Sequence, residues 1–251
     1  MATRGRCALA AGNLASVDMN NQIALVTGAS RGLGLALASA LAREGYSLII
    51  DARDSDALAK AEAEIGVPFP ASRITAIPGD VTDPVHRAAL KSAVEAAGGL
   101  DLLVNNAGTL GAHPLPSLAD YPVDELRTAF EVNVIAPVAL TQLLLPALRV
   151  RGGAVLNITS DAAVEAYAGW GGYGAAKAAL EQASNVLAAE ELTVRVWWAD
   201  PGDLRTDMHQ QAFPGEDISD RPLPSAVVPG FLRLIGERLP NGRYRAQELL
   251  S

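Results

Sequence analysis

Short apolar runs alternate with longer, Ala-rich segments along most of the chain. The apolar runs, which include IALVT at 23–27 and LLVNN at 102–106, are rich in Leu, Ile and Val and show no regular alternation with polar residues. Strands of this kind are typical of a parallel sheet that helices cover on both faces. The pattern therefore predicts an α/β fold with a doubly wound parallel sheet of about seven strands in a single domain.

The boundaries of these apolar and Ala-rich segments predict where the strands and helices begin and end. Strands are predicted at residues 22–27, 47–52, 73–77, 101–105, 153–159, 193–199 and 243–246. Helices are predicted at residues 32–45, 54–65, 84–97, 123–150, 173–190 and 225–238. The region 203–225 carries the turn chemistry of Pro and Gly residues, and we expect it to form a small lid over a substrate cleft.

The first 20 residues do not follow the alternating pattern. Arg4 and Arg6 precede an apolar stretch at 7–11, which imitates a signal peptide, but Gly12 and Asn13 interrupt the stretch after only a few residues. We therefore expect residues 1–20 to be a disordered extension or the product of a misassigned start, and residues 21–251 to form the domain.

Composition excludes several classes of protein. The net charge of −8 disfavours a nucleic-acid surface, which needs clustered Lys and Arg. Cys7 is the single cysteine, so neither an internal disulfide nor a thiolate metal site can form, and His86, His113 and His209 lack metal-ligand spacing. Polar residues interrupt the apolar segment 132–150, which argues against a membrane helix. We expect a cytoplasmic protein that binds no metal, nucleic acid or membrane.

A glycine-rich segment, TGASRGLG at 27–34, follows the first strand and opens the first helix. Glycines there allow a tight turn and a close approach of the backbone to a pyrophosphate, which the positive end of the helix attracts. Such turns also occur with nothing bound, so the strand before it and the helix after it carry the argument. The expected contacts are Gly28, Ser30, Arg31, Gly32, Leu33 and Gly34.

This segment resembles the TGxxxGxG cofactor motif of the short-chain dehydrogenase/reductase family. The segments DVT at 80–82, NNAG at 105–108 and PG at 201–202 are similar to further motifs of that family, and the resemblance spans about residues 22–246. It implies a Rossmann domain in which these segments contact the adenine and the nicotinamide ends of a dinucleotide. The cofactor contacts that it implies are Asp80, Val81, Asn106, Ala107, Gly108, Tyr173, Lys177, Pro201, Gly202 and Thr206.

The end of the second strand bears on the choice of cofactor. Counting from Gly45, the position that family members specific for NAD fill with Asp is Ala52 in this chain, and Asp51 should point to the opposite face. Arg53 and Arg31 could flank a 2′-phosphate, with Ser30 as a further ligand. We therefore expect NADP(H) in preference to NAD(H). In the alternative, both arginines are solvated and Asp51 binds the ribose.

Tyr173 and Lys177 are four residues apart, which places them on one face of a helix. A nearby ammonium favours a phenolate, so we expect Lys177 to lower the pKa of Tyr173. The resemblance implies that Tyr173 donates a proton to a carbonyl oxygen that Ser160 orients, while the nicotinamide delivers hydride to carbon. It also implies that Lys177 binds the nicotinamide ribose, and that Asn133 kinks its helix and holds a water in a proton relay.

The predicted function is therefore interconversion of a small-molecule carbonyl and a secondary alcohol with NADP(H). Two alternatives remain: a non-catalytic nucleotide-binding sensor, or an epimerase or lyase that works through transient oxidation. The resemblance further implies a homodimer or homotetramer whose interface is formed by the helices at 123–150 and 173–190.

A few residues have no settled role. Asp200, in WWADPG, departs from the family pattern and either caps a loop amide or lies near the nicotinamide. Trp170 and Tyr167 form either an apolar substrate wall or a contact between subunits. His113 and His209 follow strand ends and either line the cleft or lie on the surface.

Overall fold

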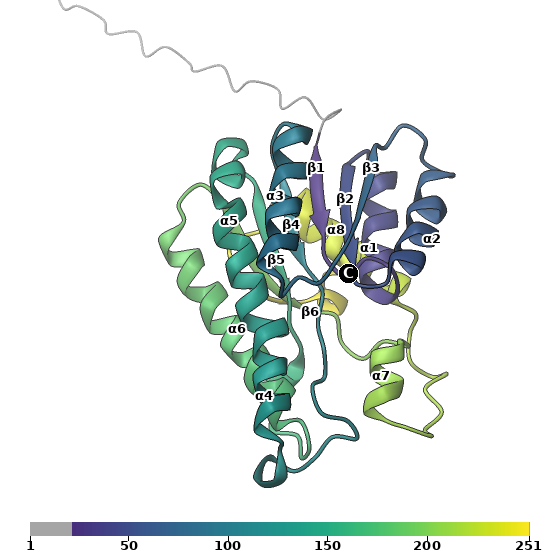
Figure 1. Ribbon diagram of the computed structural model, residues 1–251, viewed down its shortest axis with the longest axis vertical. Helices are drawn as coiled ribbons and strands as arrows, with labels where there is room; N and C mark the ends of the chain where they lie inside the picture. The colour runs from purple at the N-terminus through teal and green to yellow at the C-terminus, as the bar shows by residue number, and fades with distance from the viewer. Residues whose placement is uncertain (1–21, 251) are drawn as a thin grey trace, which may run out of the picture.

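The chain folds into a parallel sheet with helices on both faces, as the computed structural model shows for residues 22–250 (Figure 1). The seven strands are arranged in the order β3-β2-β1-β4-β5-β6-β7 and every neighbouring pair is parallel. The order of connection reverses between β1 and β4, which is where open α/β sheets bind their ligands. The predicted doubly wound fold is confirmed. The expected extension, residues 1–20, lies outside the described residues.

The elements follow the predicted ranges closely. The strands are β1 (Ile23–Val26), β2 (Ser47–Ala52), β3 (Ile74–Pro78), β4 (Leu102–Asn105), β5 (Ala154–Ile158), β6 (Arg195–Asp200) and β7 (Gly242–Arg245). The helices are α1 (Gly32–Arg43), α2 (Ser55–Gly66), α3 (Pro84–Ala97), α4 (Val123–Phe130), α5 (Ala136–Arg151), α6 (Gly171–Glu190), α7 (Asp207–Ala212) and α8 (Val228–Gly236).

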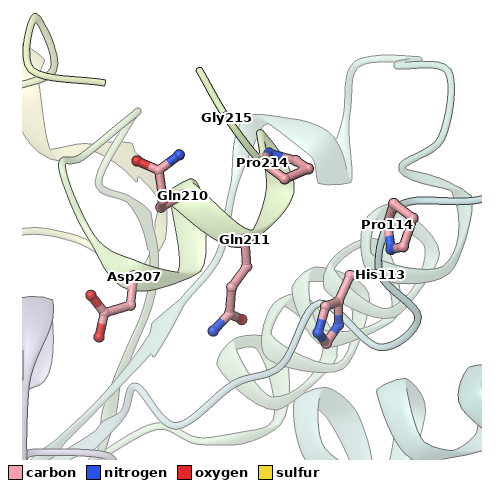
Figure 2. Close-up of a pocket in the computed structure, with 7 residues that line it drawn as sticks. All are labelled: His113, Pro114, Asp207, Gln210, Gln211, Pro214 and Gly215. Atoms are coloured by element: carbon pink, nitrogen blue, oxygen red, sulfur yellow. The ribbon is translucent and has the colours of Figure 1, made fainter. Parts of the chain in front are cut away.

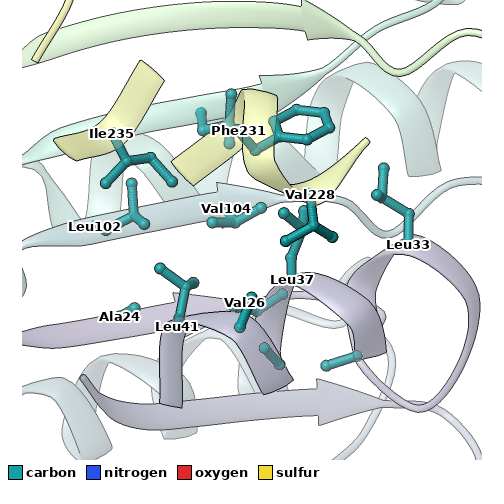
Figure 3. Packing of buried hydrophobic residues seen from close by; sticks show 14 of the residues in the cluster. Ala24, Val26, Leu33, Leu37, Leu41, Leu102, Val104, Val228, Phe231 and Ile235 are labelled. Atoms are coloured by element: carbon teal, nitrogen blue, oxygen red, sulfur yellow. The ribbon is translucent and has the colours of Figure 1, made fainter. Parts of the chain in front are cut away.

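Two apolar layers hold the helices to the sheet. In β1, the side chains of Ile23 and Leu25 belong to a cluster with α3 and α5, whereas those of Ala24 and Val26 belong to a cluster with α1 and α8. Figure 3 shows the second cluster, in which Phe231 and its neighbours on α8 pack near the residues of β1 and α1. Since alternate side chains on both faces are buried, the strands need no polar positions, which explains their continuous apolar runs.

The helix predicted at 123–150 is interrupted, which corrects the sequence interpretation. A π turn, Glu131–Ile135, separates α4 from α5. The buried side chain of Asn133 lies in this turn, and its Nδ2 atom donates hydrogen bonds to the carbonyl oxygens of Ala129 (2.9 Å) and Thr109 (2.8 Å). A π turn is a local insertion in a helix and often marks a functional position. The expectation that Asn133 distorts its helix agrees with this geometry.

The same helical run is long and apolar enough to cross a membrane, judged by length and composition alone. Its most apolar window has a mean hydropathy of 1.5, and half of that window is buried inside the fold. Leu140, Leu144 and Leu148 lie in the apolar layer against the sheet. Packing against the sheet therefore accounts for the apolar character of this helix.

The region 203–225 contains a helix that turn chemistry did not predict. Thr206 caps α7, since its Oγ1 atom accepts a hydrogen bond from the amide of His209 (3.2 Å). On α7 and just after it, Met208, Ala212 and Phe213 belong to an apolar cluster with Tyr173. The segment therefore packs over the predicted catalytic residues.

Candidate active site

The predicted site residues meet at one edge of the sheet. The segments that carry them follow the carboxyl ends of β1, β2, β3, β4, β5 and β6, and the carboxyl ends of parallel strands lie at the same edge. Tyr173 and Lys177 reach this edge from the first turns of α6. The structure thus gathers residues that are up to about 180 positions apart in the sequence.

The glycine-rich loop is packed so tightly that it admits no side chain at two positions. Gly28 has a φ of +65°, and an added Cβ atom would lie 2.9 Å from the Cα atom of Ala107. A Cβ atom on Gly34 would lie 2.3 Å from the carbonyl oxygen of Gly28. The side-chain amide of Asn106 donates to the carbonyl oxygens of Thr27 (2.9 Å) and Gly28 (3.2 Å), which ties this loop to the end of β4.

The N-terminus of α1 fits a pyrophosphate. Its N-cap residue, Arg31, has an extended backbone and forms no side-chain cap, and the first turn contains no acidic residue. The first amides of the helix are therefore left for an anion, which the helix dipole also favours. An added Cβ atom on Gly32 would meet nothing closer than Thr206 Cγ2, at 3.7 Å, so the approach to these amides is open. The residues present suit a dinucleotide.

Asp51 is enclosed beneath this loop. Its Oδ1 atom accepts a hydrogen bond from the amide of Gly28 (2.8 Å), and its Oδ2 atom lies 3.0 Å from Nε2 of His86. The residue is fully buried, and burial raises the pKa of its carboxyl group. Neither oxygen faces the cleft, which argues against the alternative in which Asp51 binds the ribose. The partnership with His86 was not foreseen from the sequence.

The two arginines predicted at the 2′-phosphate point to different neighbours. The guanidinium of Arg31 forms an ion pair with Asp207 on α7 (3.0 Å), and both side chains are about two-thirds exposed. Arg53 follows β2 and is exposed. Burial opposes ionisation of Asp80, but hydrogen bonds from Thr82 and the charge of Arg53 lower its pKa overall. Arg53 therefore acts on the segment expected at the adenine.

Lys177 is buried on the same face of α6 as Tyr173. Its Nζ atom donates to the carbonyl oxygen of Ile158 (2.8 Å) and lies 5.6 Å from the ring centroid of Tyr173. Burial lowers the pKa of Lys177 to about 8. Only one of its three donors has a protein partner among the hydrogen bonds of the described residues, so two remain for a ligand.

The pKa of Tyr173 corrects a sequence expectation. Burial of the phenol raises this pKa, the negative charges of Asp200 and Asp161 raise it further, and the hydrogen bond with Ser160 lowers it in part. The ammonium of Lys177 does not reverse the shift, since it lies against the ring and is directed to a backbone carbonyl. Tyr173 therefore holds its proton at neutral pH, as a proton donor requires.

Ser160 and Asn133 occupy different parts of the site. Ser160 follows β5, and its hydroxyl donates to Oδ1 of Asp161 (2.9 Å) next to Tyr173. Asn133 lies behind the loop after β4, where its Oδ1 atom accepts from the amide of Thr109 (3.1 Å). Its amide donors are both used by backbone carbonyls. In this structure the Asn133 side chain anchors a loop.

Asp200 has the first of the two roles considered for it. Its Oδ1 atom accepts a hydrogen bond from the amide of Gly202 (2.8 Å), so it caps the loop after β6. Its Oδ2 atom lies 3.7 Å from Nη2 of Arg243, which in turn binds Glu181. The sequence interpretation missed both partners. Glu181 follows Tyr173 by eight residues on one helical face, a signal that could have found it, whereas no local pattern marks Arg243.

A cavity of about 610 Å³ lies between α7 and the loop after β4 (Figure 2). In Figure 2, the side chains of His113 and Gln211 extend into the gap from opposite sides. The residues that line the cavity are His113, Pro114, Asp207, Gln210, Gln211, Pro214 and Gly215. Amide and imidazole groups at this position can form hydrogen bonds with a polar substrate.

Aromatic side chains pack around the ring of Tyr173. The ring of Trp170 packs edge-on against Tyr173, with 5.7 Å between centroids, and lies 5.9 Å from Phe213. His209 stacks against Phe213 at 4.8 Å and does not line the cavity. Tyr167 donates from its hydroxyl to Oδ2 of Asp161 (3.0 Å). Trp170 thus packs beside Tyr173 but is not among the residues that line the cavity, so its role as a substrate wall stays a prediction.

Comparison with known proteins gives the family. Residues 22–217 match the short chain dehydrogenase family. The chain is 36% identical over 205 residues to sepiapterin reductase of Bos taurus, with 77% of each protein covered. It is 35% identical over 200 residues to 1-deoxy-11-beta-hydroxypentalenate dehydrogenase of Streptomyces exfoliatus, with 77% of this chain and 71% of that protein covered.

Solved structures agree with this assignment. A putative short chain dehydrogenase from Pseudomonas syringae has a TM-score of 0.85 at 30% identity, over 91% of this chain and 96% of that one. A short chain dehydrogenase from Shigella flexneri, complexed with NADP, has a TM-score of 0.84 at 29% identity, over 91% and 98% of the chains. The protein belongs to the short-chain dehydrogenase/reductase family. It is an enzyme of this oxidoreductase class.

Proposed function

We propose that the protein uses NADP(H) to interconvert a carbonyl compound and a secondary alcohol, with Tyr173 as the general acid and base. The observation that carries this proposal is the meeting of Tyr173, Ser160 and Lys177 beside the glycine-rich loop that suits a dinucleotide. The bound nicotinamide supplies a hydride to the carbonyl carbon in reduction and accepts one in oxidation. The proton on the oxygen comes from Tyr173 in reduction and returns to it in oxidation.

Ser160 and Lys177 have separate roles in the proposed reaction. The hydroxyl of Ser160, which donates to Asp161 in this structure, would turn to the carbonyl oxygen when substrate binds. There it would fix the direction of the carbonyl and stabilise the negative charge that develops on its oxygen. Lys177 has donors left for the ribose hydroxyls. An added Cβ atom on Gly108 would lie 3.0 Å from Oδ1 of Asn133 and 3.8 Å from Nζ of Lys177. Both residues thus approach Gly108, and we propose that a water held near Asn133 continues a proton relay from Lys177.

The preference for NADP(H) is proposed from the end of β2. Ala52 offers no carboxylate to a ribose 2′-hydroxyl, and Asp51 is held inside the fold by Gly28 and His86. Arg53, with Arg31 from the glycine-rich loop, would pair with the 2′-phosphate. The bound NADP in the Shigella flexneri relative adds support. Adenine would lie against Asp80 and Val81, and the nicotinamide near Pro201, Gly202 and Thr206.

The first experiment is a fluorescence titration of the purified protein with NADPH and, separately, NADH, followed by addition of diketones and quinones. Tight NADPH binding with net NADPH consumption supports the proposal. Binding without turnover of any carbonyl would favour a nucleotide sensor, and epimerisation without net consumption would favour transient oxidation. Absence of binding to either cofactor would overturn the proposal.

We also propose a cytoplasmic homodimer or homotetramer, in which region 203–225 acts as a lid. Exposed apolar side chains occur on α4, α5, α6 and the π turn, the helical segments that the family resemblance implies at the subunit interface. These residues are Val123, Ile135, Val150 and Val186. Light scattering coupled to size-exclusion chromatography measures the assembly, and a monomer at micromolar concentration would contradict this part.

A further inference from the structure

Arg243 reaches from β7 to the end of β5, although β6 lies between these two strands. Its Nη2 atom donates a hydrogen bond to the backbone carbonyl oxygen of Ser160 (3.2 Å). Ser160 is the residue that we expect to orient the substrate carbonyl. A side chain from β7 therefore holds the backbone at Ser160, the residue that we expect to contact the substrate.

A carboxylate on α6 fixes the guanidinium in this position. Glu181 accepts from Nε of Arg243 through both of its oxygens, at 2.9 and 3.2 Å. The hydroxyl of Thr159 donates to the same carboxylate (2.7 Å). The side chains of Arg243 and Glu181 are 23% and 12% exposed, so solvent screens their interaction less than it screens a surface pair. The contact joins α6, β5 and β7 directly behind Ser160.

Arg243 also faces a buried negative charge. Its Nη2 atom lies 3.7 Å from Oδ2 of Asp200, whose side chain is only 6% exposed. Burial raises the pKa of Asp200, and the positive charge of Arg243 acts in the opposite sense. The negative charge of Asp200 raises the pKa of Tyr173. Arg243 is thus placed to reduce the field that Asp200 exerts on the phenol.

We propose that Arg243 is a positioning residue for the reaction: its guanidinium holds the backbone at Ser160 and balances the buried charge of Asp200 beside Tyr173. The proposal deepens the proposed function, because it assumes that Tyr173 and Ser160 act on the substrate. Arg243 itself touches neither the phenol nor the expected position of the substrate in any contact of the described residues. It acts through its neighbours.

Other charged groups surround Tyr173. Lys177 comes from α6, Asp161 follows β5 and Asp200 ends β6, while Arg245 from β7 acts on Asp200. Helix α7 contributes Met208 and Ala212 to the same cluster, and its His209 faces Asp203 and Phe213 instead. Arg245 lies two residues from Arg243 on the same strand and also lowers the pKa of Asp200, but it is half exposed and pairs with Glu248. Arg195, the exposed first residue of β6 at the opposite end of that strand from Asp200, therefore offers the control.

The test measures the ionisation of Tyr173 without any substrate. The protein is labelled with 2,3,5-trifluorotyrosine, whose much more acidic phenol brings the midpoint into the pH range of the folded protein; the signal of Tyr173 is assigned with Tyr173→Phe, and its ¹⁹F shift is followed against pH. Arg243→Met should raise the midpoint by about one pH unit and Asp200→Asn should lower it by about one unit. The double variant should titrate like Asp200→Asn, because Arg243 acts through Asp200. Arg195→Met and Arg243→Lys should keep a midpoint near that of the wild type.

Turnover supplies a second readout, with NADPH and 9,10-phenanthrenequinone as the probe. Arg243→Met should lower kcat about tenfold, because the carbonyl of Ser160 loses a charged donor, and should leave the KM for NADPH unchanged. Arg243→Lys should lower kcat while keeping the wild-type midpoint, since one ammonium cannot bind Glu181 and Ser160 in the same geometry. This split would not follow from a general loss of stability.

The outcomes separate the two proposals. If Arg243→Met gives the same midpoint and kcat as Arg195→Met, the role of Arg243 is refuted. If Arg243→Met fails to fold, Arg243→Lys and Asp200→Asn test the same role. A wild-type ¹⁹F midpoint in Asp200→Asn would then refute the proposed charge balance. Full activity of Tyr173→Phe would overturn the proposed function instead, and the ¹⁹F midpoints would still test the charge balance.

Discussion

The imidazole of His86 and the carboxylate of Asp51 form a hydrogen-bonded pair inside the fold, with 3.0 Å between Nε2 and Oδ2. Their side chains are 6% and 1% exposed. The other carboxylate oxygen holds the amide of Gly28, so the pair connects α3 to the cofactor loop. Gly79 leaves room for the imidazole, because an added Cβ atom would lie 2.1 Å from its Nδ1 atom.

The first prediction concerns this pair. His86→Leu should lower the free energy of unfolding by about 3 kcal/mol, since the variant leaves a buried carboxylate without one of its two partners. It should also weaken NADPH binding through the loop at Gly28. Urea denaturation and cofactor titration measure the two effects. Lys91→Leu, at an exposed position of the same helix, is the control, and equal stability of the two variants would contradict the role of the pair.

The second prediction concerns close packing at the cofactor loop. Gly34→Ala should abolish tight NADPH binding and destabilise the fold by about 2 kcal/mol, because the new methyl group would overlap the carbonyl oxygen of Gly28. Gly236→Ala is the matched control: an added Cβ atom there meets no atom within 4 Å, so this variant should fold at least as stably as the wild type. NADPH binding by Gly34→Ala with wild-type affinity would refute the prediction.

The third prediction tests the proton donor. Tyr173→Phe should reduce kcat by about 10³-fold, since the variant loses proton transfer in the transition state, and should bind NADPH with the wild-type Kd. Steady-state kinetics and fluorescence titration separate the two quantities. Tyr167→Phe removes a hydroxyl that bonds Asp161 near the site, and it should remain within a few-fold of the wild type.

The fourth prediction follows from the pKa of Lys177, which burial lowers from 10.5 to about 8. Between these pH values the unfolded chain binds more protons than the folded one, so the contribution of Lys177 to the free energy of unfolding rises with pH, by about 3 kcal/mol over the full window. Buried tyrosines with raised pKa values, such as Tyr46, oppose this rise only above pH 10.

Chemical denaturation at pH 8 and pH 9.5 measures this effect. The wild type should gain stability over the interval relative to Lys177→Met, which has no group to titrate there. Lys91→Met should retain the wild-type dependence, because Lys91 lies on the surface of α3. If the free energy of unfolding changed with pH in the same way for Lys177→Met and the wild type, Lys177 would not titrate in this range.

The fifth prediction concerns cofactor choice. Arg53→Ala should reduce kcat/KM for NADPH about tenfold and leave the value for NADH unchanged, because only NADPH carries the phosphate that Arg53 would bind. Ala52→Asp should raise the efficiency with NADH, since it supplies a carboxylate for the ribose hydroxyl. Arg73→Ala, which removes an exposed charge at the start of β3, controls for net charge. Equal losses with both cofactors in Arg53→Ala would contradict the assignment.

Local pattern was sufficient for the strands and the glycine-rich loop. Both ends of the strand at 47–52 were predicted correctly, because the strand is buried on both faces and its sequence is therefore mostly apolar. The family resemblance implied a distortion at Asn133, but the residue pattern itself showed neither the π turn nor helix α7, since each depends on contacts with distant loops. The turn residues around Pro214 led to the prediction of turns for this region, so the short helix before them was not recognised.

The electrostatics of the site needed the tertiary structure. Spacing alone predicted that Lys177 would lower the pKa of Tyr173, but spacing contains no information on burial or on the charge of Asp200. His86 and Arg243 carry no local signal, because their partners are 35 and 83 positions away. Residue identity and spacing located Tyr173 as the candidate proton donor, whereas its buried and charged surroundings determine the direction in which its pKa shifts.

The hydrogen bond from Arg243 to Ser160 also has a consequence for synthesis on the ribosome. The glycine-rich loop, β5 and α6 all precede β7 in the chain, so a nascent chain can form the dinucleotide half of the fold before β7 emerges. The carbonyl of Ser160 receives its guanidinium partner only when β7 joins the edge of the sheet. The growing polypeptide should therefore gain affinity for the cofactor before it gains full catalytic competence.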